Sequence, residues 1–245
     1  MAFNSLMTLA VIEVRKEVVT GKKNPSVIEL GNQRLRIDKK LKDRVYPMLG
    51  LPNSNPTSTK EFYESIGFSK YLAIDVNTEK DAIALDLNLD LRKEYNYTEQ
   101  YDLVTNNGTG EHIFNQLTVF KNVHDLCKVG GIMIHNLPFT GYLDHGFYNF
   151  QPNLFVELAR SNKYTMKHLW IGSSDGKRVE KIDVLNGYYK NNDFLKRFDM
   201  NNWNQNLLVT AIMQKQNSQE FKMPFQNMYD DAITEESIKS RYEKS

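Results

Sequence analysis

Residues 27–33 of the chain read VIELGNQ. An apolar run that ends in an acid and a glycine is typical of a buried strand entering a ligand-binding turn, because glycine permits a tight turn and a close approach to a ligand. The glycines that recur in a phosphate-binding turn are missing, since Gln33 and Leu35 stand in their places. The sequence therefore predicts a ligand site that offers little grip for a pyrophosphate.

Short apolar runs of strand type recur along most of the chain, separated by longer polar or helical stretches. This alternation is typical of an α/β fold, in which a mostly parallel sheet carries helices on both faces. Residues 111–130 are expected to include a helix, because their apolar residues recur every three or four positions. The expected strands are 26–30, 71–75, 101–106, 130–138, 164–174 and 206–215, with a short strand or loop near 84–88.

The chain divides into three parts. The distance from Gly31 to Asp75 is about twice the roughly 20-residue spacing of a compact dinucleotide-binding unit, so an insertion is expected around 41–66. Pro47 is expected to break regular structure ahead of a helix near 58–66. The predicted parts are an N-terminal helix within 1–23, the sheet domain over 24–214 and a C-terminal appendage over 215–245.

Composition narrows the class of protein. The 245 residues include 31 Lys and Arg against 30 Asp and Glu, which leaves no strong field to attract nucleic acid or an anionic membrane. The single Cys127 excludes an intramolecular disulfide and fits a reducing compartment. The opening lacks a signal-peptide pattern, and no apolar run approaches the roughly 20 residues of a spanning helix. We expect a cytoplasmic enzyme without nucleic-acid or membrane partners.

Polar residues at the strand ends indicate the kind of ligand. In an open parallel sheet, ligands bind beyond the carboxyl ends of the strands, where the strand order reverses. Gly31 can bring backbone close to a ligand, Asp75 can accept paired hydrogen bonds from a ribose diol, and Asp86 can accept from an exocyclic amine. These residues together predict a nucleoside-containing ligand without phosphates.

Five segments in order resemble the motifs of one family. VIELGNQ, YLAIDVN, LDLN, YDLVTNNGTGEH and LCKVGGIMIHNLP resemble successive motifs of the class I methyltransferases that use S-adenosylmethionine. The resemblance covers roughly residues 24–214. It implies a Rossmann-like seven-stranded sheet that is mostly parallel, with an antiparallel last strand, and S-adenosylmethionine as the cofactor.

The resemblance also assigns eight residues to the cofactor. It gives the methionine end to Glu29 and Gly31 with the adjoining Asn32, the ribose to Asp75 with Val76, the adenine to Asp86 and Leu87, and a backbone contact near the sulfonium to Asn106. A structural alternative remains for Glu29 and Asp75, in which each caps a helix that follows it.

Two histidine-bearing loops, 107–116 and 135–155, are expected at the same edge of the sheet. A histidine with a near-neutral pKa can take the proton of an attacking hydroxyl. His145, which follows Asp144 and precedes a glycine, is the first candidate for this catalytic base, and His112 is the second. In the alternative, these imidazoles hydrogen-bond to backbone and hold the loops in place.

A metal site was weighed on the same residues. His112, His135, Asp144 and His145 carry groups that suit a divalent ion. No HExxH or comparably tight spacing accompanies them, so the sequence predicts no metal.

Aromatic residues gather in the second loop. With His135, they are candidates for contact with the substrate, or alternatively they pack the loop on the core. The substrate-binding candidates are His135, Tyr142, Phe147 and Tyr148, and Tyr188 with Tyr189 form a further pair.

The sequence thus predicts a methyltransferase that uses S-adenosylmethionine on a small-molecule, sugar or sugar-phosphate acceptor, most simply by O-methylation. The loop pattern resembles methyltransferases of surface-polysaccharide modification, and a homodimer is compatible with the sequence. Two other classes stay open. One is a nicotinamide-dependent oxidoreductase on a related sheet, and the other is a non-catalytic partner subunit with the methyltransferase fold, in which His112 and His145 would be dispensable.

Overall fold

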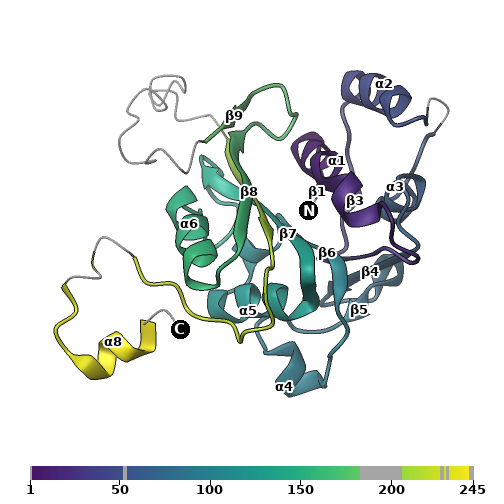
Figure 1. Ribbon diagram of the computed structural model, residues 1–245. Helices are drawn as coiled ribbons and strands as arrows, with labels where there is room; N and C mark the ends of the chain where they lie inside the picture. The colour runs from purple at the N-terminus through teal and green to yellow at the C-terminus, as the bar shows by residue number, and fades with distance from the viewer. Residues whose placement is uncertain (1, 52–53, 183–205, 227–228, 230–231, 243–245) are drawn as a thin grey trace.

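The computed structural model describes residues 2–51, 54–182, 206–226, 229 and 232–242. A central sheet of eight strands runs in the order β5-β4-β2-β6-β7-β10-β8-β9 (Figure 1). The strands are β2 (Ser26–Leu30), β4 (Lys70–Asp75), β5 (Ile83–Ala84), β6 (Tyr101–Asn107), β7 (Cys127–Thr140), β8 (Thr165–Gly172), β9 (Val179–Lys181) and β10 (Leu207–Gln214).

The sheet direction agrees with the sequence-based expectation. Neighbours from β5 through β7 pair in parallel, and β10 enters antiparallel between β7 and β8. The mostly parallel α/β fold and the antiparallel late strand are therefore confirmed. The short strand β9 adds to the edge beside β8, which makes eight strands instead of the seven expected.

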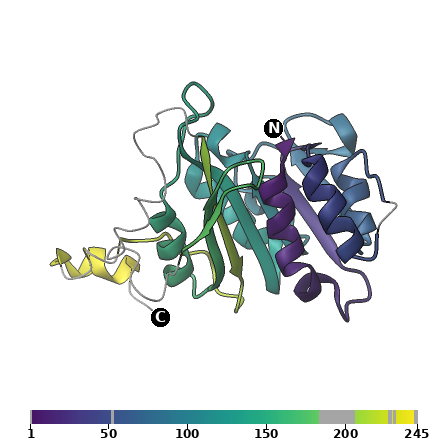
Figure 2. The same cartoon turned by 90° about the horizontal axis from the view of Figure 1, so that it is seen from above.

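Helices cover both faces of the sheet, as Figure 2 shows from above. On one face lie α1 (Ser5–Val19), α2 (Lys39–Met48) and α3 (Thr59–Ser65), and on the other lie α4 (Leu91–Tyr95), α5 (Gln116–Leu126) and α6 (Pro152–Ser161). Successive side chains of a strand point to opposite faces. Val27 accordingly packs with the first layer and Ile28 with the second, which explains why β2 is a continuous apolar run.

The inserted region and the helix expected within 111–130 both differ in detail from what the sequence predicts. Pro47 lies in the last turn of α2, so regular structure stops after it and not before it. Helix α3 confirms the helix expected near 58–66, and Ser58 caps it by accepting from the Glu61 amide. Helix α5 begins only at residue 116, because the Asn115 side chain caps it. A short 3-10 turn, η2 (Gly110–His112), precedes this cap.

The two ends of the chain join the main fold to different degrees. Helix α1 is part of the core, since its own residues Val11 and Val14 are fully buried. After β10 the chain runs across α5 and α6, where the Gln219 carbonyl lies 2.9 Å from His124 Nε2 and the Lys222 carbonyl accepts from Asn162. The first part of the predicted appendage is therefore tied to the fold. Helix α8 (Glu236–Tyr242) lies away from the sheet in Figure 1.

Within the described residues, no helix is both long and apolar enough to cross a membrane.

Candidate functional site

The order of the sheet reverses between β2 and β6, so their carboxyl ends mark the place where such sheets bind ligands. Polar side chains fill the space between these ends. Gln33, which is buried, donates from Nε2 to the Asn107 carbonyl over 2.9 Å, and the Thr109 hydroxyl donates to the Leu30 carbonyl. Gln33 therefore covers strand ends that a glycine would have left open to a ligand.

The segment after Gly31 continues as a strand. Residues of β3 (Arg34–Leu35) pair in parallel with β1 (Ala2–Phe3), and the side-chain amide of Asn107 donates to the Ala2 carbonyl. Gly31 keeps a positive φ of 83°, which suits glycine at the tight turn that the sequence predicted. The missing second and third glycines have a structural cause, because the chain straightens there and does not wrap a phosphate.

The ends of β4 and β5 bring the predicted nucleoside-binding residues together. The half-buried Asp75 carboxylate accepts from the backbone amides of Asn32, over 2.9 Å, and Val76, over 2.7 Å. The Leu85 amide donates to the Asp75 carbonyl, which places Asp86 at the same edge. The Asn77 side-chain amide also donates to the Asp75 carboxylate, over 2.9 Å. Carboxylate oxygens offer about four lone-pair sites, so Asp75 can still accept from one hydroxyl of a diol.

The apolar residues at this edge also suit a nucleoside. The Val76 side chain is 74% exposed although it is apolar, and Leu87 is buried. An exposed apolar side chain next to a half-buried acid offers one surface for the face of a base and one acceptor for a sugar. These residues fit the nucleoside end of S-adenosylmethionine.

The side chains predicted for the methionine end lie elsewhere. Glu29 is fully buried on the α3 side of the sheet, where it accepts from Tyr71 over 2.8 Å and from Tyr63 over 3.2 Å. Burial raises the pKa of Glu29 to about 7, although both tyrosine hydrogen bonds act to lower it. The Asn106 side chain is also buried and accepts from the Gly110 amide. The Glu29 carboxylate is therefore a structural group within the sheet, whereas the backbone contact predicted for Asn106 stays a prediction.

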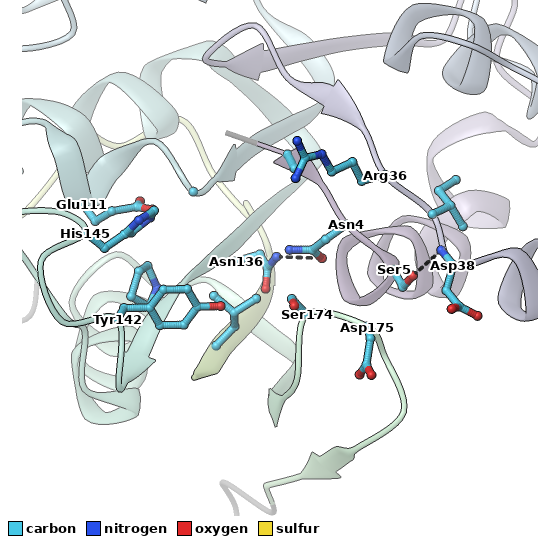
Figure 3. Close-up of a pocket in the computed structure, with 15 residues that line it drawn as sticks. Asn4, Ser5, Arg36, Asp38, Glu111, Asn136, Tyr142, His145, Ser174 and Asp175 are labelled. Carbon is cyan, nitrogen blue, oxygen red and sulfur yellow. Dashed lines mark hydrogen bonds and ion pairs between the residues drawn. The ribbon is translucent and has the colours of Figure 1, made fainter. Parts of the chain in front are cut away.

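A cavity of about 660 Å³ opens on the same edge, over β6, β7 and β10 (Figure 3). Glu111, Tyr142 and His145 form one side, and the start of α1 with the segment after β3 forms the opposite side. Gly31 and Asp75 lie outside this lining. The lining residues are Ala2, Asn4, Ser5, Arg36, Ile37, Asp38, Gly108, Glu111, Asn136, Pro138, Tyr142, His145, Ser174, Asp175 and Leu208.

Three ionisable side chains meet at this side of the cavity. Nε2 of His145 lies 3.5 Å and Nε2 of His112 lies 3.7 Å from Glu111 Oε1. The Glu111 side chain is only 1% exposed, and within the described part of the chain its two oxygens have no hydrogen-bond partner. Burial raises the pKa of Glu111 to about 7, while burial and the charge of His145 lower the pKa of His112.

The sequence predicted His112 and His145 at one edge, and the structure brings their rings to 4.9 Å between centroids. It did not predict Glu111. The available signal was the Glu-His pair that directly follows a strand end and its turn. Because a carboxylate beside an exposed loop histidine is common, the signal shows its meaning only when the burial of Glu111 is known.

The other substrate-binding candidates separate in space. Tyr142 lines the cavity, and burial followed by the charge of Glu111 raises its pKa to about 12. Phe147 is 67% exposed and stacks edge-on with Phe114, outside the lining. The Tyr148 hydroxyl donates to the Phe114 carbonyl, so it holds the loop.

His135 is placed differently from the prediction. Its ring is buried in the core against Phe120 and Phe155, and burial lowers its pKa to about 3. The alternation of side chains along β7 sends it inward, away from the cavity. Tyr188 and Tyr189 lie outside the described residues.

Comparison with known proteins found similarity of fold only. No protein-family model and no curated protein matches the chain. Among solved structures, the 1,6-didemethyltoxoflavin-N1-methyltransferase of Burkholderia thailandensis, bound to S-adenosylhomocysteine, is 13% identical with a TM-score of 0.46 over 87% of this chain and 80% of that one. The N-methyltransferase NodS of Bradyrhizobium japonicum, also with S-adenosylhomocysteine, is 10% identical with a TM-score of 0.45 over 87% and 89%.

A third structure is the O-methyltransferase of a trans-AT polyketide synthase multienzyme from Brevibacillus brevis, again with S-adenosylhomocysteine. It is 10% identical with a TM-score of 0.47 over 86% of this chain and 73% of that one. At these scores the likeness assigns no site and no acceptor. The sheet itself, with β10 antiparallel between β7 and β8, gives the chain the Rossmann-like fold of the class I methyltransferases.

Proposed function

We propose that the protein is a methyltransferase that uses S-adenosylmethionine to methylate an oxygen of a small polyhydroxylated acceptor, such as a sugar or sugar phosphate. The observation that carries this proposal is the edge formed by the ends of β4 and β5. There a half-buried acid, Asp75, lies beside an exposed apolar side chain, Val76, and the sheet order places both next to the switch point.

The residues at this edge have separate tasks in the proposal. Asp75 accepts from the ribose diol, Val76 covers one face of the adenine, and Asp86 accepts from its amine. Gln33 shapes the methionine end in place of the usual glycines, through its contact with the Asn107 carbonyl. When bound, S-adenosylmethionine supplies an electrophilic methyl group, whose bond to sulfur breaks as the bond to the acceptor forms.

The cavity supports a polar acceptor. Its wall carries side-chain amides, hydroxyls and charged groups, among them Asn4 and Ser5, which can hydrogen-bond to hydroxyl groups of an acceptor. Arg36 lies on the opposite side from Glu111 in Figure 3 and offers a cation for a phosphate or carboxylate of the acceptor. These groups can bind the hydroxyls and the charge of a sugar-like acceptor, while apolar side chains such as Ile37 and Leu208 can contact its ring.

The histidine cluster supplies the base in this proposal. A hydroxyl must lose its proton as it is methylated, and His145, which lines the cavity, can accept that proton at Nε2 and release it to solvent. Glu111, 3.5 Å away, stabilises the imidazolium that forms. The chain otherwise contributes proximity and orientation of the acceptor oxygen.

The test is calorimetric titration of the full chain with S-adenosylhomocysteine and, separately, with NAD. We expect binding of S-adenosylhomocysteine only, weakened at least about tenfold in Val76→Ser and Asp75→Asn, because each removes one nucleoside contact. The matched control is Asp43→Asn, an exposed acid on α2 that should leave affinity unchanged.

The rival classes predict other outcomes. Binding of NAD alone would overturn the proposal and favour the oxidoreductase. Binding of neither ligand would favour a non-catalytic subunit, as would S-adenosylhomocysteine binding with no methyl transfer to any member of a panel of sugars and sugar phosphates.

A further inference from the structure

The cluster of Glu111, His112 and His145 holds an unexplained feature. Burying a carboxylate without a hydrogen bond or an ion partner is costly, and proteins rarely leave such a group unsatisfied. The Glu111 side chain is 1% exposed, and both of its oxygens lack a hydrogen-bond partner among the residues that the structure describes. The two nearest candidates, both histidine Nε2 atoms, lie at 3.5 and 3.7 Å, beyond a normal hydrogen bond.

We propose that Glu111, His112 and His145 bind a divalent first-row transition-metal ion. Each offers one ligand atom, and these atoms all lie within 4.8 Å of one another. Two imidazoles and one carboxylate are a donor set that such ions prefer, whereas Mg²⁺ and Ca²⁺ prefer oxygen alone. Ligands about 2.0–2.2 Å from an ion lie roughly 3.0–3.5 Å from each other, so small side-chain rotations are enough to close the site.

This set differs from the one weighed in the sequence. His135 is buried in the core and Asp144 is not among the converging ligands. Glu111 takes the place of both. Its position directly before His112 in η2 allows one turn of chain to supply two ligands, while the loop after β7 supplies the third.

The loop that carries His145 is fixed against Glu111. The Phe147 amide donates to the Glu111 carbonyl over 2.7 Å. A side chain at Gly146 would place its Cβ 2.8 Å from Glu111 Cγ, so glycine is needed for this close approach. Tyr142 and Asp144 in the same loop have positive φ angles of 52° and 57°. Such conformations cost energy and persist where surrounding contacts enforce them.

The ion would face the cavity, because Glu111 and His145 both line it. A site with three protein ligands leaves coordination positions open, as catalytic metal sites do. With the ion bound, His145 would be a ligand and would no longer act as the base. An acceptor with a hydroxyl beside a second oxygen could bind to the ion instead, and its hydroxyl would lose its proton to solvent more readily there. This role in catalysis rests on the proposed function, whereas binding of the ion does not.

The experiment uses the full chain without a histidine tag, stripped with EDTA and dialysed. Zn²⁺ is titrated calorimetrically, and Co²⁺ is followed by visible absorption, which reports its coordination number and geometry. We expect about one equivalent of each ion, micromolar or tighter affinity for Zn²⁺ and a rise in unfolding temperature. Glu111→Gln and His145→Gln should each weaken binding at least about tenfold, since each removes one of three ligands.

The chain offers a matched control for these variants. His168 on β8 lies 3.4 Å from Glu13 on α1, a surface histidine–glutamate pair away from the cavity. His168→Gln should leave affinity and stoichiometry unchanged. His145 is 41% exposed, so its variant is expected to fold even if Glu111→Gln does not, and circular dichroism checks both.

Two results would overturn the metal site. One is that His145→Gln binds Zn²⁺ with the same affinity as the wild type. The other is that His145→Gln and His168→Gln lose the same amount of affinity for Zn²⁺. The outcome is separable from the methyltransferase proposal. Zn²⁺ binding without S-adenosylhomocysteine binding would leave the metal site standing and reject the proposed function, and the converse result would reject only the metal site.

Discussion

Two glutamates in this protein are buried to almost the same extent in opposite surroundings. Glu29 is 0% exposed and Glu111 is 1% exposed, and burial raises the pKa of each to about 7. Tyr63 and Tyr71 donate to both oxygens of Glu29, whereas the oxygens of Glu111 face two histidines and a cavity. Burial and a raised pKa are therefore common to an acid that is satisfied inside the protein and to one for which we propose a function. Over the described residues, the two acids differ in whether their oxygens accept hydrogen bonds.

The largest difference is expected in turnover. Glu111→Gln should lower kcat/KM for methyl transfer to a sugar or sugar-phosphate acceptor by at least about 100-fold, because it removes the charge that supports deprotonation of the acceptor. Glu29→Gln should change kcat/KM by less than about threefold. Transfer of labelled methyl groups measures both. Losses of similar size in the two variants would remove the distinction between the glutamates.

Stability should show the reverse order. Glu29→Ala is expected to cost about 3 kcal/mol, because it leaves the buried hydroxyls of Tyr63 and Tyr71 without their acceptor and opens a cavity. Glu111→Ala should cost about 1 kcal/mol or less in the absence of metal, since no hydrogen bond of its side chain is lost. Urea unfolding in the presence of EDTA measures both values, and a larger cost for Glu111→Ala would contradict the comparison.

The pH dependence of stability contains contributions from both glutamates, and comparison of wild type with Glu29→Gln isolates that of Glu29. Its pKa rises from 4.5 in the unfolded chain to about 7 in the folded one, so the folded state binds more protons between these values. The free energy of unfolding should therefore fall as pH rises from 4.5 to 7 and level off above, by about 3 kcal/mol from this group. The difference between wild type and Glu29→Gln in urea unfolding at pH 5 and pH 8 reports it. An unchanged difference would show that Glu29 is ionised throughout.

The smallest expected effect concerns the contact between Glu111 and the loop that carries His145. Gly146→Ala should reduce turnover about tenfold and cost about 1 kcal/mol, because the new Cβ pushes His145 away from Glu111. Gly50→Ala is the control, since its positive φ of 75° gives a comparable stability cost in open space. If both variants retain full turnover, the close approach at Gly146 does not position the cluster.

Much of the fold was predictable from sequence because burial on both faces leaves a strong local signal. The runs at 26–30 and 71–75 are strands within a residue of the expected bounds. The helix expected within 111–130 is α5. The two-residue strands β1 and β3 were not predictable, since they are too short to carry a period. Their pairing depends on residues far apart in the chain.

The sequence indicated the edge of the sheet where the candidate residues would lie, but not which other residues they would contact. Strand ends indicated where Asp75, Asp86, His112 and His145 would gather. Sequence could not show that Glu29 turns toward Tyr63 and Tyr71, because β2 has buried neighbours on both faces and the tyrosines come from other elements. It could not show that Gln33 closes the space between β2 and β6, since that contact joins residues 33 and 107.

The position of β10 has a consequence for synthesis of the chain on the ribosome. Strand β10 lies between β7 and β8, although among the described residues it is the last strand to be made. Until it emerges, β7 presents an unpaired edge, which is a template for association with other chains. The cavity needs both Asn4 and Leu208, from near the start of the chain and from β10. A nascent chain can therefore assemble β5 through β7 early, yet it gains a complete cavity only after β10 has been translated.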